Sequence, residues 1–194
     1  MSTLEVNSIA PLSSSSDVTL GGSSKNVKFA SGTTVDFSTN TPTLTLGSAM
    51  KSTPFFEAYP SSDTSIASST VVKVPANTEK FDSDGCYDNS TNYRFTPTTA
   101  GKYFCYMSYS YNIVAGNVGL VAEIKKNGTA VLSGKYGASS NSSDNYLNNT
   151  VSGIIDFNGT SDYIEMFTNT SSGITRTLSG DSQRTFFGAY RIIA

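Results

Sequence analysis

One stretch of ten residues, KYFCYMSYSY, limits what this chain can fold into more than any other. It runs from Lys102 to Tyr111, and five of its ten residues are Tyr or Phe. Successive side chains of a β-strand point to opposite faces of the sheet, so a half-exposed strand should carry aromatic residues on one parity only. Here they fall on both, since Tyr103 is followed directly by Phe104. The stretch therefore predicts a strand that is covered on both sides.

The composition favours strands over helices. Charged residues make up only 14% of the chain, and much of its polar share comes from Ser, Thr, Asn and Gly. These residues favour turns and strands, and long Ala, Leu, Glu and Lys runs of helical period are absent. We expect an all-β protein.

Several activities are disfavoured by what the sequence lacks. It has no histidine, which removes Ser-His-Asp and Cys-His nucleophiles and histidine metal sites. A pair of carboxylates could still act as a glycosidase, but most of the 15 Asp and Glu residues stand in turn-like segments such as FDSDG and NSSDN. We expect no enzymatic activity, no cofactor and no metal.

Charge and hydropathy also bear on the partners. The 13 Lys and Arg residues are scattered and the net charge is -2, which gives nucleic-acid binding little support. No apolar run approaches the roughly 20 residues of a membrane span, and the N-terminus lacks the pattern of a cleaved signal peptide. We expect neither membrane insertion nor export through such a signal. Cys86 and Cys105 could form a disulfide or remain two free thiols.

The first 50 residues differ from the rest. Apolar pairs recur there every 8 to 9 residues, each followed by a Ser, Gly or Thr-rich joint: Val18-x-Leu20, Val27-x-Phe29, Val35-x-Phe37 and Leu44-x-Leu46. Such short strands cannot bury an apolar face alone, but copies from three chains could share one core. We predict that residues 1–50 form a repetitive β-rich shaft or virion-attachment segment. A flexible Ser/Thr linker is the alternative.

Residues 51–194 are richer in aromatic residues and contain strand-like stretches bounded by turn residues. Nine of them are expected to be strands: PFFEAYP, STVVKVP, the region around NYRFTP, GKYFCYMSYSYNI, GLVAEIKKNG, TAVLSGKYG, NNTVSGIIDFNG, SDYIEMFTN and QRTFFGAYRII. The Asn-Gly pairs at Asn127 and Asn158 are typical of type I′ hairpin turns. Strands at this spacing indicate a β-sandwich or jelly roll.

Several motifs of this second region occur in a recognisable order. They are Phe55 to Ala58, Val71 to Val74, Tyr87-Asp88, Phe95-x-Pro97, Gly101-x-Tyr103, Ile124 to Gly128, Tyr163 to Met166 and Thr185 to Tyr190. This ordered set resembles the C1q/TNF-like jelly roll, specifically its C1q-type branch, over roughly residues 52 to 194. The resemblance implies a jelly-roll β-sandwich that assembles as a homotrimer.

The chain departs from that family in three places. Cys105 stands where the family usually has an aromatic residue, Thr160-Ser161-Asp162 replaces the usual Gly-Asp pair before Tyr163, and no collagen repeat lies upstream. These departures point to a distant branch and leave ligand specificity open.

In trimers of this family, one sheet of each jelly roll also faces the threefold axis, so its strands are covered on both faces. The resemblance therefore places Tyr103, Cys105 and Met107 toward one layer, and Phe104 and Tyr106 toward the other. It implies five candidate residues of the trimer interface: Phe56, Phe104, Tyr106, Ile164 and Phe187.

Receptor-contacting residues are not identified by the sequence. The loops Ser61 to Ser69, Ser139 to Asn149 and Ser171 to Asp181 are candidates because loops on a rigid scaffold vary freely. Tyr109 and Tyr111 come late in the aromatic stretch. The alternative that these two side chains are exposed and contact a ligand stays open.

The opening MSTLEVNSI, followed by SSSSDVTLGGS, resembles the starts of virion structural proteins of tailed bacteriophages, particularly fibre-like ones. We therefore expect a trimeric, fibre-like virion protein assembled in the host cytoplasm. Its N-terminal segment would attach to other virion proteins, and a host-surface receptor or glycan is the candidate partner of its head. The alternatives are an architectural capsid, decoration or head-fibre protein without receptor contact, and a secreted C1q/TNF-like ligand.

Overall fold

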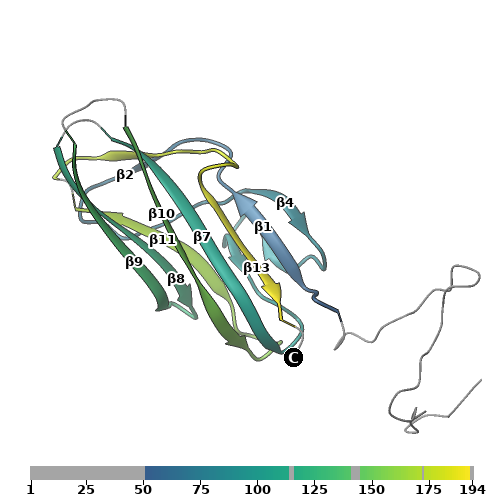
Figure 1. Ribbon diagram of the computed structural model, residues 1–194. Coiled ribbons are helices and arrows are strands. Elements are labelled where there is room, and N and C mark those ends of the chain that lie inside the picture. Colours follow the sequence, from purple (N-terminus) through teal and green to yellow (C-terminus); the bar gives the residue numbers. More distant parts are fainter. Residues whose placement is uncertain (1–50, 114–115, 141–144, 172, 193–194) are drawn as a thin grey trace, which may run out of the picture. The chain divides into compact units, whose positions relative to one another are not determined.

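The computed structural model describes residues 51–113, 116–140, 145–171 and 173–192 (Figure 1). The predictions for residues 1–50 lie outside the described residues. Within the described ranges the chain forms strands and turns and no helix. The all-β prediction is therefore confirmed for this part of the chain.

The strands form two antiparallel sheets. In the larger sheet β10 flanks β7, and the remaining strands follow the order β2–β12–β7–β13–β1–β4. The smaller sheet has the order β5–β6–β11–β8–β9, with β3 also beside β11. The seven-stranded sheet contains β1 (Phe55–Tyr59), β2 (Thr64–Ile66), β4 (Thr78–Asp82), β7 (Gly101–Ile113), β10 (Asn145–Phe157), β12 (Arg176–Leu178) and β13 (Phe186–Arg191). The six-stranded sheet contains β3 (Val72–Lys73), β5 (Tyr87–Asp88), β6 (Arg94–Phe95), β8 (Gly116–Lys126), β9 (Thr129–Ser140) and β11 (Ile164–Thr170).

Each of the nine expected stretches contains a strand. The short strands β2, β4, β5 and β12 are additional, with only two to five residues each.

The aromatic stretch KYFCYMSYSY lies on β7, an inner strand of the seven-stranded sheet (Figure 1). Strand β10 pairs with β7 from Gly101 to Ile113, while β13 and β12 share its other edge. Its odd-numbered side chains are fully buried between the two sheets: Tyr103, Cys105, Met107, Tyr109 and Tyr111. Phe104 and Tyr106 are half-buried and point the other way, so the predicted division of the strand is confirmed.

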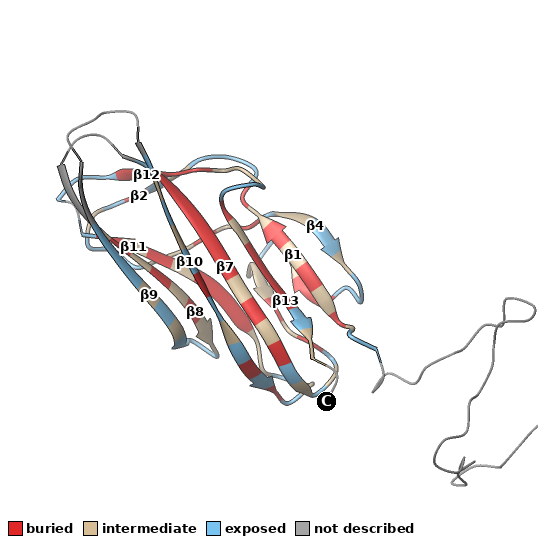
Figure 2. Cartoon of the chain, in the orientation of Figure 1, coloured by how far each residue is buried: buried red, intermediate tan, exposed pale blue. Residues whose placement is uncertain are grey.

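Buried residues alternate with less buried ones along β1 (Figure 2), and the core beside this strand is densely aromatic. The ring of Phe56 stacks on Tyr87 and Phe95, at centroid distances of 4.7 and 4.4 Å. It also meets Phe187 edge-on at 5.1 Å. Each such ring contributes roughly 1.5–3 kcal/mol through burial, so this cluster joins the two sheets.

The buried tyrosines of β7 find hydrogen-bond partners within the chain, as buried hydroxyl groups must. The Tyr103 hydroxyl donates to the Thr99 carbonyl at 2.7 Å. The Tyr111 hydroxyl lies 2.8 Å from the Thr168 hydroxyl, and the Tyr109 hydroxyl accepts from Asn149 at 3.3 Å. Burial raises the pKa of Tyr109 to about 12. The hypothesis that Tyr109 and Tyr111 are exposed to a ligand is wrong, because both belong to the core.

Cys86 and Cys105 are both free and buried. Burial raises the pKa of the Cys105 thiol to about 12, so this thiol stays protonated near neutral pH. Of the two alternatives left open by the sequence, the structure has the pair of thiols.

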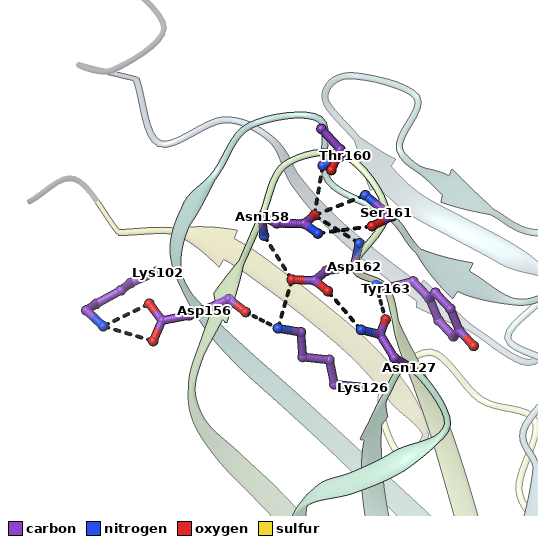
Figure 3. Close-up of polar contacts among 9 residues, drawn as sticks. All are labelled: Lys102, Lys126, Asn127, Asp156, Asn158, Thr160, Ser161, Asp162 and Tyr163. Carbon is purple, nitrogen blue, oxygen red and sulfur yellow. Dashed lines mark hydrogen bonds and ion pairs between the residues drawn. The ribbon is translucent and has the colours of Figure 1, made fainter.

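The first Asn-Gly pair forms the expected hairpin. Asn127 and Gly128 have φ angles of 51° and 83°, the positive values that a type I′ turn requires, and they join β8 to β9. The Asn127 side chain also accepts the Tyr163 backbone N–H at 3.0 Å and donates to Asp162 at 2.8 Å (Figure 3).

The second Asn-Gly pair does not form a hairpin, contrary to the prediction. It joins β10 of one sheet to β11 of the other. The Asn158 side-chain oxygen accepts the backbone N–H groups of Thr160, Ser161 and Asp162 at 2.9–3.0 Å (Figure 3). Hydrogen bonds from Lys126 and Asn127 hold the pKa of Asp162 below its usual range. The signal was correct for a turn but not for strand pairing, because the side chain stabilises a crossing between sheets.

Two glycines close the sandwich along the edge where β9 lies against β10. A Cβ atom at Gly153 would stand 2.6 Å from the Leu132 side chain, and one at Gly134 would stand 2.6 Å from Val151. Each aliphatic side chain thus occupies the space above the glycine on the opposite strand. The two edge strands come together because these positions have no side chain.

Gly153→Val should therefore lower the free energy of unfolding by about 1–3 kcal/mol, because the added methyl groups overpack the contact with Leu132. Urea denaturation measures this loss. Ser133→Val is the matched control on β9, where Ser133 is exposed, and it should change stability by less than about 0.5 kcal/mol. Equal effects of the two substitutions would show that the edge does not depend on the glycine.

Candidate functional site

The outward side of the seven-stranded sheet carries a continuous group of aromatic and aliphatic side chains. Along one row of the sheet, Ile154 pairs with Phe104, Phe104 with Tyr190, and Tyr190 with Phe55. Paired residues of antiparallel strands lie on the same face. We call this group the aromatic face and define it by seven residues: Phe55, Phe81, Phe104, Tyr106, Ile154, Phe186 and Tyr190.

These side chains contact one another while remaining accessible. Phe104 lies 5.5 Å from Tyr190 and 6.1 Å from Tyr106 between ring centroids. Exposure reaches 60% for Ile154, 46% for Tyr190 and 44% for Phe81. Scattered apolar residues are normal on a protein surface, whereas a contiguous apolar group of this kind marks an interaction site.

The aromatic face has a polar centre formed by Glu57, Tyr106 and Lys80. One carboxylate oxygen of Glu57 accepts the Tyr106 hydroxyl at 2.7 Å, and the other pairs with the Lys80 ammonium at 2.6 Å. The same ammonium lies 5.4 Å from the centre of the Phe186 ring. Burial, together with the Glu57 carboxylate, raises the pKa of Tyr106, so its hydroxyl remains a donor.

Gly188 on β13 permits this arrangement. It pairs with both Glu57 and Tyr106, so it lies between them in the sheet. A Cβ atom at this position would stand 2.5 Å from the end of the Tyr106 ring and 2.9 Å from the Phe56 carbonyl oxygen. The Tyr106 side chain crosses the glycine to reach Glu57 because no side chain is in its way.

The outward side of the six-stranded sheet is different in kind. Its aromatic rings are covered by cations, with Lys125 at 4.2 Å from the Phe167 ring and Arg94 at 4.6 Å from the Tyr163 ring. Lys125 also pairs with Glu123. Charged groups over aromatic rings are typical of a solvated surface. The two outer faces of the sandwich therefore differ in the surface that they offer to a partner.

The five candidate interface residues divide between the surface and the core. Phe104 and Tyr106 lie on the aromatic face, and their place in a trimer interface stays a prediction. Phe56, Ile164 and Phe187 have no exposed surface, so these three candidates are corrected to core residues. Phe56 and Phe187 follow Phe55 and Phe186 on the opposite parity, and Ile164 belongs to the six-stranded sheet.

Sequence reasoning missed five members of the aromatic face: Phe55, Phe81, Ile154, Phe186 and Tyr190. For β1 a usable signal existed, because Glu57 shares a parity with Phe55 and a carboxylate favours the outward side. Phe81 and Ile154 stand on strands whose sequences lack an aromatic run, and pairing alone brings them to the face.

Two of the three candidate loops are held together. The Gly173 N–H donates to the Ser68 hydroxyl at 2.9 Å, and the Gly180 N–H donates to the Asp63 carboxylate at 2.8 Å. These two segments contain β2 and β12, which pair with each other, so the expected loops are partly strands of the larger sheet. Part of the third loop, 139–149, lies outside the described residues.

The described ranges contain no group of three or more Cys, Asp or Glu residues that could hold a metal ion. No helix in these ranges is long and apolar enough to cross a membrane.

Comparison with known proteins identifies the fold and not a family. No family model and no curated protein matches the sequence. Among solved structures, murine APRIL at pH 5.0 is similar with a TM-score of 0.51 and 17% identity, covering 72% of this chain and 98% of that one. Eiger TNF from S. frugiperda is similar with a TM-score of 0.51 and 10% identity, covering 73% of this chain and 94% of that one. At these identities the likeness concerns the fold alone, and the chain has a TNF-like jelly-roll fold, as the sequence predicted.

Gly188→Ala should destabilise the protein by about 1–3 kcal/mol, because its methyl group displaces the Tyr106 ring from Glu57. Urea denaturation in wild-type and Tyr106→Ala backgrounds separates the causes. The cost of Gly188→Ala should fall by at least half when Tyr106 is absent, with the remainder due to the Phe56 carbonyl. An unchanged cost would contradict the assigned role of the glycine.

Proposed function

We propose that this chain is a non-enzymatic, homotrimeric head protein whose copies pack together through the aromatic face. In this proposal the whole chain is a phage fibre-like virion protein. Residues 51–194 form its head, which recognises a host-surface receptor or glycan. The observation that carries the proposal is the aromatic face itself, which leaves seven large side chains in mutual contact on the outside of a folded chain.

Burial favours an assembly through this face. Covering an aromatic or aliphatic side chain contributes about 25 cal/mol for each Å² removed from water. A central apolar cluster with paired polar groups is also how stable interfaces are built. The C1q/TNF-like resemblance of the sequence supports three copies as the number of subunits.

The virion context rests on the N-terminal sequence. The opening MSTLEVNSI, followed by SSSSDVTLGGS, resembles the starts of fibre-like phage virion proteins, and the apolar pairs between Val18 and Leu46 suit a shared three-chain shaft. Receptor contact is assigned to the turns that flank β2 and β12, since the hydrogen bonds of Gly173 with Ser68 and of Gly180 with Asp63 give a fixed platform for variable side chains.

A secreted C1q/TNF-like ligand is the second candidate, because the TNF-like fold suits it equally well. An architectural virion protein without receptor contact is the third. Electron microscopy of purified virions labelled with an antibody to the head separates them. Signal on the particle supports the virion assignment, and binding of isolated heads to host cells distinguishes recognition from architecture.

Phe104→Asp and Tyr106→Asp should each convert the trimer into a folded monomer, because assembly would bury an unpaired carboxylate. Sedimentation velocity at micromolar concentration measures the change. Phe167→Asp places the same charge on the face of the other sheet and should leave the trimer intact.

Tyr103→Ala should act on the subunit instead, with a loss of about 3–5 kcal/mol in unfolding free energy, since Tyr103 is fully buried. A wild-type protein that sediments as a monomer would overturn the proposal. So would aspartate variants at Phe104 and Tyr106 that remain trimeric with unchanged stability.

A further inference from the structure

A charged pair among the apolar side chains of the aromatic face requires an explanation. Glu57 pairs across the sheet with Gly188 and Phe81, and it has aromatic neighbours on β4 and β7. Its side chain is only 13% exposed before any partner binds. A partner that covers the aromatic face therefore removes most of the remaining water from this carboxylate and from Lys80.

The Glu57–Lys80 pair limits which partner surfaces can cover the aromatic face favourably. Taking a charge out of water is costly unless its partners and remaining hydrogen bonds are kept. A generic apolar surface would cover the rings favourably, but it would leave Lys80 donors and Glu57 lone pairs without partners. A surface with polar groups in the matching positions avoids that cost, which is how interfaces reject wrong partners.

We infer that the Glu57–Lys80 pair makes the aromatic face selective for a second copy of this chain, and fixes the register in which that copy packs. This inference rests on the proposed trimer. Tyr106 is the positioning residue of the pair, because its hydroxyl holds the second carboxylate oxygen at 2.7 Å and Gly188 keeps its path clear.

A second ion pair, on the smaller sheet, supplies a matched control. Glu123 and Lys125 also form an ion pair between neighbouring half-buried side chains, but on the charged outer face. If the Glu57–Lys80 pair served only general solubility, neutralising either ion pair should have the same effect on assembly.

The test uses the full-length chain in four forms besides wild type: Lys80→Met, Glu57→Gln, the double variant E57Q/K80M and the control E123Q/K125M. Sedimentation velocity over a concentration series measures trimer affinity and the number of species, and circular dichroism checks the fold. Lys80→Met should weaken the trimer about tenfold or more, because assembly then buries an unpaired carboxylate.

The double variant should regain tight association, because both charges are gone, but should lose the single stoichiometry and form a range of oligomers. E123Q/K125M should stay a single trimer. Glu57→Gln should weaken the trimer less than Lys80→Met, since an amide still accepts from Tyr106.

Three results overturn the inference. The first is a Lys80→Met variant whose trimer affinity equals that of a trimeric wild type. The second is an E57Q/K80M double variant that forms a single trimeric species. The third is a control that behaves like E57Q/K80M. Each of them leaves the proposed trimer standing. A monomeric wild type would instead overturn the proposed function, and the inference with it.

Discussion

The alternation of side chains along β7 is the constraint on which the rest of the structure depends. Its inward residues, from Tyr103 to Tyr111, fill the space between the sheets and satisfy their hydroxyls within the chain. The pleat then forces Phe104 and Tyr106 onto the outer side, where β10 and β13 bring further apolar residues beside them. A strand with aromatic residues on both parities thus produces a core and an exposed apolar surface together.

The aromatic face gains specificity from its polar centre. Glu57 is already bonded to both Lys80 and Tyr106 before any partner binds, so the surface is preorganised. Preorganised groups lose less freedom on association. The opposite sheet shows the contrast, since Lys125 and Arg94 cover the rings of Phe167 and Tyr163 with charge. The proposed assembly uses the face that water solvates poorly and leaves the charged face to solvent.

The fold was predictable from sequence because its signals are local: strand-length aromatic runs, turn residues and the Asn-Gly hairpin at Asn127. The aromatic face was predictable only in part. In the Phe-Phe pairs of β1 and β13, the two adjacent residues are identical, so the pair itself does not show that Phe55 and Phe186 face outward. For β1 the outward parity is marked only by Glu57, and for β13 it depends on the register with β7. Asn158 gave the correct turn but the wrong connection, because whether a turn pairs two strands or crosses between sheets depends on distant partners. The Glu57–Lys80 pair required the β1–β4 register, which sequence spacing does not reveal.

Hydroxyl-radical footprinting of the full-length protein tests the central claim most directly. Tyr190 on the aromatic face and Tyr136 on β9 are similarly exposed in the single chain, at 46% and 42%. If copies pack through the aromatic face, Tyr190 should be labelled several-fold less than Tyr136 in the assembled protein. The two should be labelled equally in the Tyr106→Asp monomer. Equal labelling of Tyr190 and Tyr136 in the wild-type assembly would contradict the account.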